Sequence, residues 1–444
     1  MSFPSHIFRS YDIRGLLDEV TPELAEKAGA IFAKKTGAKK VVVGRDMRAT
    51  SPELMTAAIR GVTSVGVEAI DIGMTTTSLF NYCFSSFGEE TAGMMITASH
   101  NPAKYNGLKF YDCGNLPVSG KIMKDWVEEE IILATTSGTV TKKDLLNDYL
   151  TQCLSLSGQP NFSGVKVVVD YGNGVGVITV RALLEKLGVT TLELYPEPDA
   201  NFPNHEANPA KEETMNDLKA AVVKENAVLG IALDGDVDRT AFVDNEGKSL
   251  GGDLLLALLS RELLGHRAGA KIVVSPNQSW ATFDSVAENG GQIISCPIGR
   301  TNILATMKKE AADLGGEVSG HFFWKEFSDL ESVDYTIIKV LDVWKKSGQT
   351  FADLVRPLRR YHNSGEVNLE IEDRDIVIKK LEDKYVSQAT TVERMDGIRC
   401  EFNRDWWFIA RLSNTEPILR LTVEAKSEEL MQEKVEELKK VINE

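Results

Sequence analysis

The chain has 444 residues, too many for one hydrophobic core, so we expect two to four domains. Its formal net charge of −15 opposes nonspecific binding to nucleic acid or to an anionic membrane. No apolar run is long enough to predict a membrane span, the first ten residues contain no apolar signal segment, and the five cysteines never form a CxxC pair. We therefore expect a cytoplasmic protein with free thiols.

Strands and helices are predicted to alternate from the start of the chain. Residues 39–44 and 67–72 read as strands, and Thr50 with Pro52 and Glu53 predicts a capping-box helix that runs to about residue 64. This alternation is typical of a βαβ module with a largely parallel sheet. In such a sheet, ligands collect at the carboxyl ends of the strands.

A polar loop, TASHNP at 97–102, follows the next predicted strand, residues 92–96. Pro102 prevents a strand or helix from continuing through it, so Ser99 is presented on a loop. Taken alone, such a serine most often hydrogen-bonds its own backbone. Residues 106–110 form the following predicted strand.

A second predicted α/β module contains an acidic loop. Its strand 227–233 runs directly into Asp234-Gly235-Asp236-Val237-Asp238-Arg239. Carboxylates at i, i+2 and i+4 project to one side of an extended segment, where they repel one another unless a cation lies among them. Oxygen ligands suit Mg²⁺ or a similarly hard ion, whereas Arg239 and Asn245 stand where a calcium EF-hand needs Gly and Glu.

Two further polar loops lie in the last third of the chain. Residues 315–321, GGEVSGH, place a carboxylate, a hydroxyl and an imidazole among glycines, which suits hydrogen bonds to a polyol. The predicted strand 406–411 enters RLSNTEP at 411–417, whose guanidinium and short polar side chains suit a phosphate. A predicted helix over 375–390 and another from Ser427 give the C-terminal part an α+β character.

With these four motifs in this order, the chain resembles the alpha-D-phosphohexomutase family, and it is most similar to the phosphomannomutase/phosphoglucomutase branch. The resemblance implies an α/β protein of three related modules with mixed, largely parallel sheets, plus a smaller C-terminal α+β domain, around a central cleft. The implied domains are 1–145 with the phosphoserine loop, 146–250 with the metal loop, 251–361 with the sugar loop and 362–444 with the phosphate loop.

The resemblance also implies roles for individual residues. Ser99 carries the transferred phosphoryl group, and Lys109 and Arg239 supply positive charge beside it. His100 and Lys109 are both candidates for the proton acceptor. The implied Mg²⁺ ligands are Ser99, Asp234, Asp236 and Asp238. The implied substrate contacts are Tyr11, Arg14, Arg300, Glu317, Ser319, His321, Arg411, Ser413, Asn414 and Thr415.

The implied reaction interconverts a hexose 1-phosphate and a hexose 6-phosphate, of mannose or glucose, through a phosphoserine enzyme and a hexose 1,6-bisphosphate. Glucose 1,6-bisphosphate, or another hexose 1,6-bisphosphate, is the expected activator. Alternatives are a phosphoglucosamine mutase, a catalytically inactive sugar-phosphate binding protein and a phosphatase that uses the same metal site. The expected partner is the phosphosugar substrate, with the protein a monomer or weak homodimer.

Overall fold

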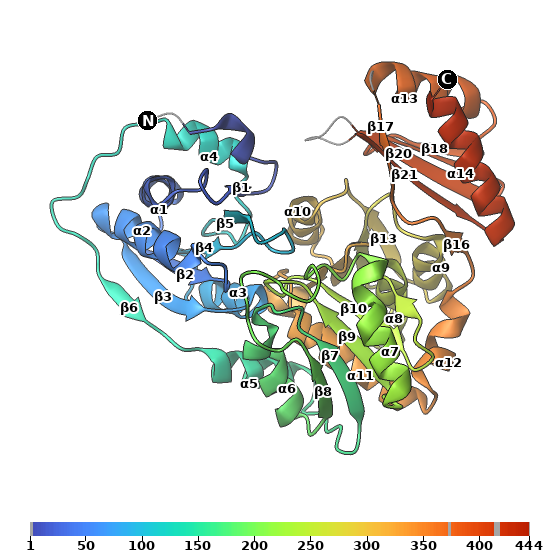
Figure 1. Ribbon diagram of the computed structural model, residues 1–444, viewed down its shortest axis with the longest axis horizontal. Helices are drawn as coiled ribbons and strands as arrows, with labels where there is room; N and C mark the ends of the chain where they lie inside the picture. The colour runs from blue at the N-terminus through green and yellow to red at the C-terminus, as the bar shows by residue number, and fades with distance from the viewer. Residues whose placement is uncertain (1–2, 372–373, 413–417, 444) are drawn as a thin grey trace. The chain divides into compact units, whose positions relative to one another are not determined.

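The computed structural model describes residues 3–371, 374–412 and 418–443 (Figure 1). The chain divides into two compact units, each described here by itself. The first unit contains residues 1–251 and 319–354, and the second contains residues 252–318 and 355–444. Short 3₁₀ helices occur at Ser5–Ile7, Val175–Ile178, Glu212–Met215, Lys325–Phe327 and Arg356–Leu358.

The first sheet of the first unit is mixed, with the order β1-β5-β4-β2-β3-β6. Strands β2, β3, β4 and β6 run parallel, whereas β5 pairs antiparallel with both β4 and β1. The strands are β1 (Ile13–Leu16), β2 (Lys40–Arg45), β3 (Glu68–Met74), β4 (Thr91–Ile96), β5 (Tyr105–Tyr111) and β6 (Val140–Lys142). The helices are α1 (Pro22–Thr36), α2 (Ser51–Ser64), α3 (Thr77–Ser86) and α4 (Gly120–Val127).

Helices cover both faces of this sheet, so β4 is buried along its whole length. Met94 and Ile96 belong to the core formed with α1 and α2, whereas a Cβ at Gly93 would meet Phe80 and Phe84 of α3 on the opposite face. A continuous apolar run is the pattern expected of such a doubly covered strand. The strand therefore delivers the 97–102 loop from the core.

The expected capping box at Thr50 is wrong, although the helix that it predicted is present. Thr50 is the N-cap of α2, but its side chain caps no backbone N–H of the helix. Its Oγ1 instead accepts a hydrogen bond from Asn106 Nδ2 at 2.9 Å. A tertiary hydrogen bond has replaced the local one.

The second sheet of the first unit is also mixed, with the order β11-β10-β9-β7-β8. Its strands are β7 (Lys166–Asp170), β8 (Thr190–Leu194), β9 (Leu229–Leu233), β10 (Thr240–Asp244) and β11 (Ser249–Leu250). The other elements of this unit are α5 (Leu146–Leu156), α6 (Val180–Lys186), α7 (Asn216–Lys224), β15 (Phe322–Trp324) and α11 (Val333–Ser347); α12 (Phe351–Val355) follows.

The second unit contains a parallel group of strands, β13-β12-β14, and a separate antiparallel sheet. The first group comprises β12 (Lys271–Val274), β13 (Gln292–Ser295) and β14 (Leu314–Gly316), with α8 (Gly252–His266), α9 (Trp280–Glu288) and α10 (Arg300–Glu310). The antiparallel sheet comprises β16 (His362–Asn363), β17 (Val367–Glu370), β18 (Thr391–Glu393), β19 (Ile398–Phe402), β20 (Trp406–Leu412) and β21 (Ile418–Ala425).

Helices α13 (Arg374–Tyr385) and α14 (Glu428–Asn443) share an apolar core with this antiparallel sheet. The helix expected over 375–390 thus ends five residues early, in a turn at 386–388. The predicted fold class is confirmed: α/β modules with mixed sheets are followed by a smaller α+β domain. The boundaries expected at 145, 250 and 361 stay predictions.

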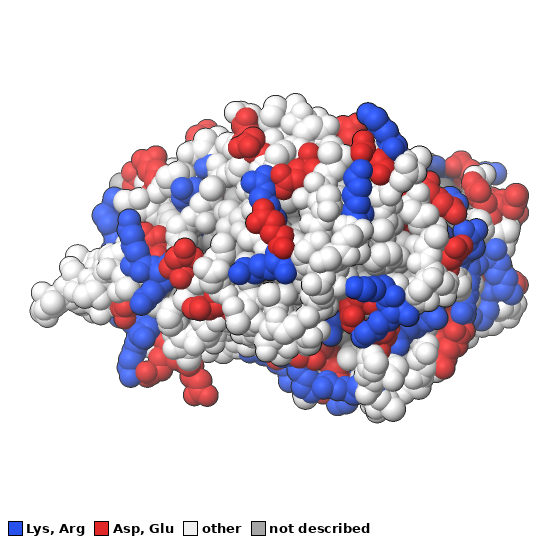
Figure 2. Space-filling view, turned by 90° about the horizontal axis from the view of Figure 1, so that it is seen from below, with Lys and Arg blue, Asp and Glu red and all other residues white. Residues whose placement is uncertain are grey.

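Charged side chains of both signs are interspersed over the face shown in Figure 2. On this face the negative charge of the chain, whose net charge is −15, is therefore not concentrated in one patch. Among the residues that the structure describes, no helix has both the length and the apolar character needed to cross a bilayer.

Candidate active site

Ser99 lies in the loop between β4 and β5 and is only 2% exposed. Its backbone N–H donates to Thr97 Oγ1 at 2.8 Å, and its φ of 50° lies in the left-handed region. Non-glycine residues rarely adopt this conformation, and where it persists the surrounding structure must hold it. The loop thus fixes the direction of the Ser99 hydroxyl.

The acidic loop between β9 and β10 is a turn, so the expectation of an extended segment is wrong. Asp234 Oδ1 accepts the backbone N–H groups of Asp238 and Arg239 at 3.0 and 3.1 Å, and Val237 has a φ of 59°. A β-branched residue in this region is strained. The turn nevertheless gathers the three carboxylates, as the spacing predicted.

The two loops meet within the first unit. Ser99 Oγ donates to Asp234 Oδ2 at 2.8 Å and lies 3.2 Å from His100 Nδ1. The approach requires glycine at position 235, because a Cβ there would lie 2.7 Å from the Ser99 carbonyl oxygen. The predicted nucleophile and the predicted metal loop are therefore in direct contact.

Lys109 neutralises part of the acidic charge. It lies on β5 and directs Nζ to Asp236 Oδ2 at 2.7 Å and to Asp238 Oδ2 at 2.6 Å. All three side chains are at most 4% exposed. Buried charges are stable only when paired and hydrogen-bonded, so this lysine is integral to the acidic loop.

The aspartate cluster has the donor set for a divalent cation. Ligand oxygens of Asp234, Asp236 and Asp238 lie within 4.8 Å of one another, and all three residues are buried. Asp236 Oδ1 is buried without a hydrogen-bond partner in the described chain. A buried carboxylate oxygen rarely remains unsatisfied, so these residues fit a hard metal ion.

Burial and charge set the protonation states around Ser99. Burial, with the neighbouring Asp238 and Asp236 carboxylates, raises the pKa of Asp234 well above its usual value. Burial acts in the same direction on Asp238, but Lys109 and His321 hold the pKa of that carboxyl well below its usual range. Burial and the cations Arg239 and Arg14 lower the pKa of His100, so its imidazole is neutral at pH 7.

His321 brings part of the predicted sugar loop to the aspartates. Its Nε2 lies 3.4 Å from Asp238 Oδ1 and 3.3 Å from Arg239 Nε, while Nδ1 lies 3.0 Å from Ser319 Oγ. Gly320 permits this contact, because a Cβ there would lie 2.6 Å from the Thr240 carbonyl oxygen. Ser319, His321 and Arg239 therefore join the cluster.

Arg14 also reaches the serine loop, from β1. Nη1 donates to Asn101 Oδ1 at 3.0 Å and Nη2 to Asp12 Oδ2 at 2.5 Å, whereas the buried Nε has no hydrogen-bond partner among the described residues. Tyr11 lies two residues before β1 and is 36% exposed. Arg14 is thus close to the loop.

The remaining predicted contacts belong to the second unit. Arg300 is the first residue of α10, and Glu317, which follows β14, is 7% exposed. Arg411 lies near the end of β20, where Nη2 donates to Glu366 Oε2 at 3.3 Å. Ser413, Asn414 and Thr415 lie outside the described residues.

The sequence did not predict the support that α3 gives to the acidic loop. Thr77 donates its backbone N–H to the Asp236 carbonyl at 2.7 Å and its hydroxyl to Asp236 Oδ2 at 3.0 Å. Ser78 Oγ donates to the Val237 carbonyl at 3.1 Å. Thr76-Thr77-Ser78 follow β3, whose carboxyl end lies at the same sheet edge as that of β4, and this position could have revealed them.

Comparison with known proteins identifies the family. The phosphoglucomutase/phosphomannomutase alpha/beta/alpha domains I, II and III match residues 5–135, 146–247 and 251–361. The C-terminal domain of the same family matches residues 366–441.

Relatives align along nearly the whole chain. A protein described as phosphohexose mutases, from Xanthomonas campestris pv. campestris (strain B100), is 34% identical, with 96% of each chain covered. The phosphomannomutase/phosphoglucomutase of Pseudomonas aeruginosa (strain PAO1) is 33% identical, covering 96% of this chain and 93% of the relative. The crystal structure of a Burkholderia thailandensis phosphoglucomutase/phosphomannomutase family protein has a TM-score of 0.89 at 29% identity, with 99% and 97% of the two chains covered. The chain belongs to the phosphoglucomutase/phosphomannomutase family.

Proposed function

We propose that this chain is a phosphohexomutase that interconverts the 1-phosphates and 6-phosphates of mannose and glucose through a phosphorylated Ser99. The relatives named as mutases support an intramolecular phosphotransferase activity. The observation that carries the proposal is the contact of Ser99 Oγ with Asp234 Oδ2 at 2.8 Å, within a buried cluster that includes Lys109 and His321.

In the first half-reaction, the bond between phosphorus and Ser99 Oγ breaks as the free hydroxyl oxygen of the hexose phosphate bonds to phosphorus, and the Ser99 oxygen takes up a proton to become a hydroxyl. His100 is proposed to accept the hydroxyl proton, because its neutral imidazole has a lone pair, whereas Lys109 is engaged by two carboxylates. The bisphosphate then reorients, and Ser99 receives the other phosphoryl group. Glucose 1,6-bisphosphate, or another hexose 1,6-bisphosphate, would prime an unphosphorylated enzyme and so act as the activator.

The charges of the cluster suit this reaction. A phosphoserine carries about −1.5 to −2 charges at pH 7, close to three aspartates. Lys109, Arg239 and Arg14 supply positive charge nearby. Asp234, Asp236 and Asp238, together with Ser99 Oγ, would hold Mg²⁺, which would neutralise charge that develops on the phosphoryl oxygens.

The substrate contacts are proposed from the family resemblance. Glu317 and Ser319 would bind sugar hydroxyls, with Arg300 and His321 close to the phosphosugar and Tyr11 and Arg14 as secondary contacts. Because glucose and mannose differ only at C2, contacts to O3 and O4 would accept both. Arg411, Ser413, Asn414 and Thr415 would bind the phosphate that does not react.

The test offers the purified protein glucose 1-phosphate, mannose 1-phosphate and glucosamine 1-phosphate in parallel, with Mg²⁺ and a trace of glucose 1,6-bisphosphate. Comparable conversion of the first two to 6-phosphates supports the proposal. Conversion of glucosamine 1-phosphate alone assigns the chain to a phosphoglucosamine mutase, and phosphate release without isomer formation indicates a phosphatase. No conversion of any substrate overturns the mutase proposal and favours a binding protein.

The proposal extends to a cytoplasmic protein that is a monomer or weak homodimer. All five cysteines are free, and four of them are buried, which fits a reducing compartment. Sedimentation at several protein concentrations tests the oligomeric state.

A further inference from the structure

Arg48 is a buried arginine that donates hydrogen bonds to the backbone of the loop that carries Ser99. It follows β2, is 1% exposed and donates to four backbone carbonyls of residues 99–105. Nη2 donates to the carbonyls of Ser99 and Asn101 at 2.8 and 2.5 Å, and Nη1 to those of Pro102 and Tyr105 at 3.0 and 2.9 Å. The two terminal nitrogens thus use all four of their N–H donors on one loop.

A buried carboxylate fixes the orientation of this guanidinium. Asp46 Oδ2 accepts from Arg48 Nε at 3.1 Å, and Asp46 Oδ1 accepts the Arg48 backbone N–H at 3.0 Å and the Ser51 hydroxyl at 2.6 Å. Both charged side chains are only 1% exposed. The ion pair is therefore held at one geometry, because all five side-chain donors of the arginine are occupied.

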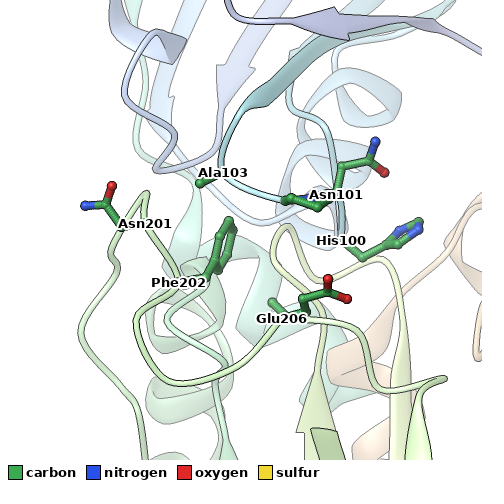
Figure 3. Close-up of a pocket in the computed structure, with 8 residues that line it drawn as sticks. His100, Asn101, Ala103, Asn201, Phe202 and Glu206 are labelled. Atoms are coloured by element: carbon green, nitrogen blue, oxygen red, sulfur yellow. The ribbon is translucent and has the colours of Figure 1, made fainter. Parts of the chain in front are cut away.

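An aromatic ring covers the guanidinium. Phe202 belongs to the long segment between β8 and α7, and its ring centroid lies 5.2 Å from Arg48 Cζ, within cation–π distance. The ring lines a pocket that has His100, Asn101 and Ala103 on one side and Asn201, Phe202 and Glu206 on the other (Figure 3). Phe202 thus lies against the serine loop as well as Arg48.

We propose that Arg48 is a positioning residue for phosphoryl transfer: its fork of N–H donors holds the 99–105 backbone so that Ser99 Oγ stays directed at Asp234. The proposal rests on the proposed function. Its basis is geometric, because Ser99 has a φ of 50° and a loop in this conformation needs external support. Lysine cannot replace the fork, since it offers one nitrogen with three donors.

The test compares Arg48→Lys and Arg48→Ala with the wild type, and uses Arg60→Ala as the matched arginine control. Arg60 lies on α2 with a side chain that is 58% exposed and paired with Glu26. For both Arg48 variants we expect kcat to fall about 10²-fold with KM changed less than about 3-fold, because misplacing a reacting atom by about 1 Å has an effect of this size. Phosphorylation of Ser99 by glucose 1,6-bisphosphate should slow by a similar factor, and Arg60→Ala should match the wild type.

Chemical rescue distinguishes positioning from a general loss of folding. Guanidinium chloride at a non-denaturing concentration should restore part of the kcat of Arg48→Ala, and potassium chloride at the same ionic strength should not. If Arg48→Ala does not fold, Phe202→Leu takes its place, and kcat should fall with KM unchanged.

Wild-type kcat in folded Arg48→Lys overturns the positioning role and leaves the proposed function intact. A kcat that falls only in proportion to the unfolded fraction overturns it as well. An inactive wild type instead refutes the proposed function itself.

Discussion

The buried cluster around Ser99 and the region around Arg411, which we propose binds phosphate, are built in opposite ways. Ser99, Asp234 and Asp236 are at most 2% exposed, and the contacts of Lys109 with the aspartates are 2.7 and 2.6 Å long. Arg411 has a side chain that is 16% exposed, and it meets Glu366, 39% exposed, at 3.3 Å. The first arrangement is preorganised, whereas the second is a longer and more exposed ion pair.

This difference fits the two roles that we propose, phosphoryl transfer at Ser99 and binding of the other phosphate at Arg411. A transferred phosphoryl group needs groups that are already in place when charge develops, since catalysis comes from positioning and preorganised electrostatics. A phosphate that is bound and released on each turnover needs a guanidinium whose resting partner can be exchanged. Exposed ion pairs contribute only about 0–1 kcal/mol, so we propose that Glu366 gives way to the substrate phosphate at Arg411.

The largest expected effect concerns the buried cluster around Ser99. Ser99→Ala should lower kcat by at least about 10³-fold, because no oxygen remains to carry the phosphoryl group. A coupled assay of glucose 6-phosphate formation measures it, with Ser64→Ala on α2 as the matched control. Ser64 Oγ donates to the Gly61 carbonyl within the same helix, so that variant should keep wild-type turnover. Full activity in Ser99→Ala would refute the phosphoserine role.

A smaller loss is expected when one aspartate is neutralised. Asp236→Asn removes a charge partner of Lys109 and one of the proposed metal ligands, so kcat should fall about 10²-fold. Half-maximal activity should also require more Mg²⁺, which a titration after chelation measures. An unchanged Mg²⁺ requirement would exclude Asp236 as a ligand.

At Arg411 we expect an effect on the binding of the substrate. Arg411→Ala should raise KM by about 10- to 100-fold, with a smaller change in kcat, because a charged hydrogen bond contributes about 1.5–3 kcal/mol. Arg420 is the matched control, since it pairs with the same carboxylate at 3.4 Å. If Arg420→Ala raises KM as much as Arg411→Ala does, the assignment of Arg411 to the phosphate is wrong.

The last prediction concerns stability and no change in turnover, at a buried carboxylate that differs from the aspartates around Ser99. Asp334 Oδ2 accepts from the Tyr149 hydroxyl at 2.9 Å, and burial raises the pKa of Asp334 to about 6 from an ordinary value of 3.8. A raised carboxyl pKa means that the folded state binds more protons than the unfolded state between these values. Stability is therefore lost as the pH rises from about 4 to 6.

Asp334→Asn should remove this loss. The free energy of unfolding of the variant minus that of the wild type should rise by up to about 3 kcal/mol between pH 4 and pH 7.5. Urea unfolding at the two pH values measures both differences. An equal difference at the two values would show that Asp334 is ionised without penalty.

Much of this organisation could be predicted from the sequence, because apolar runs that end in polar loops mark the carboxyl ends of strands. The sequence predicts Ser99 and the three aspartates in this way, and the structure places Ser99 against Asp234 and gathers the three carboxylates. The turn at Val237 was missed, because local spacing does not reveal a positive φ in a β-branched residue. Thr50, Thr77 and Arg48 were missed or misassigned, since the loops and strands that they support lie more than 50 positions away in the chain.

The central claim is that Ser99 carries the phosphoryl group during turnover, and peptide mass spectrometry tests it most directly. The enzyme is incubated with Mg²⁺ and glucose 1,6-bisphosphate. One sample is quenched at once, and a parallel sample is chased with glucose 1-phosphate before it is quenched. The account predicts a phosphoryl group on Ser99 that forms and disappears at least as fast as turnover, with bisphosphate appearing in the chase. A phosphoryl group on another residue, or one on Ser99 that the chase does not remove, would contradict it.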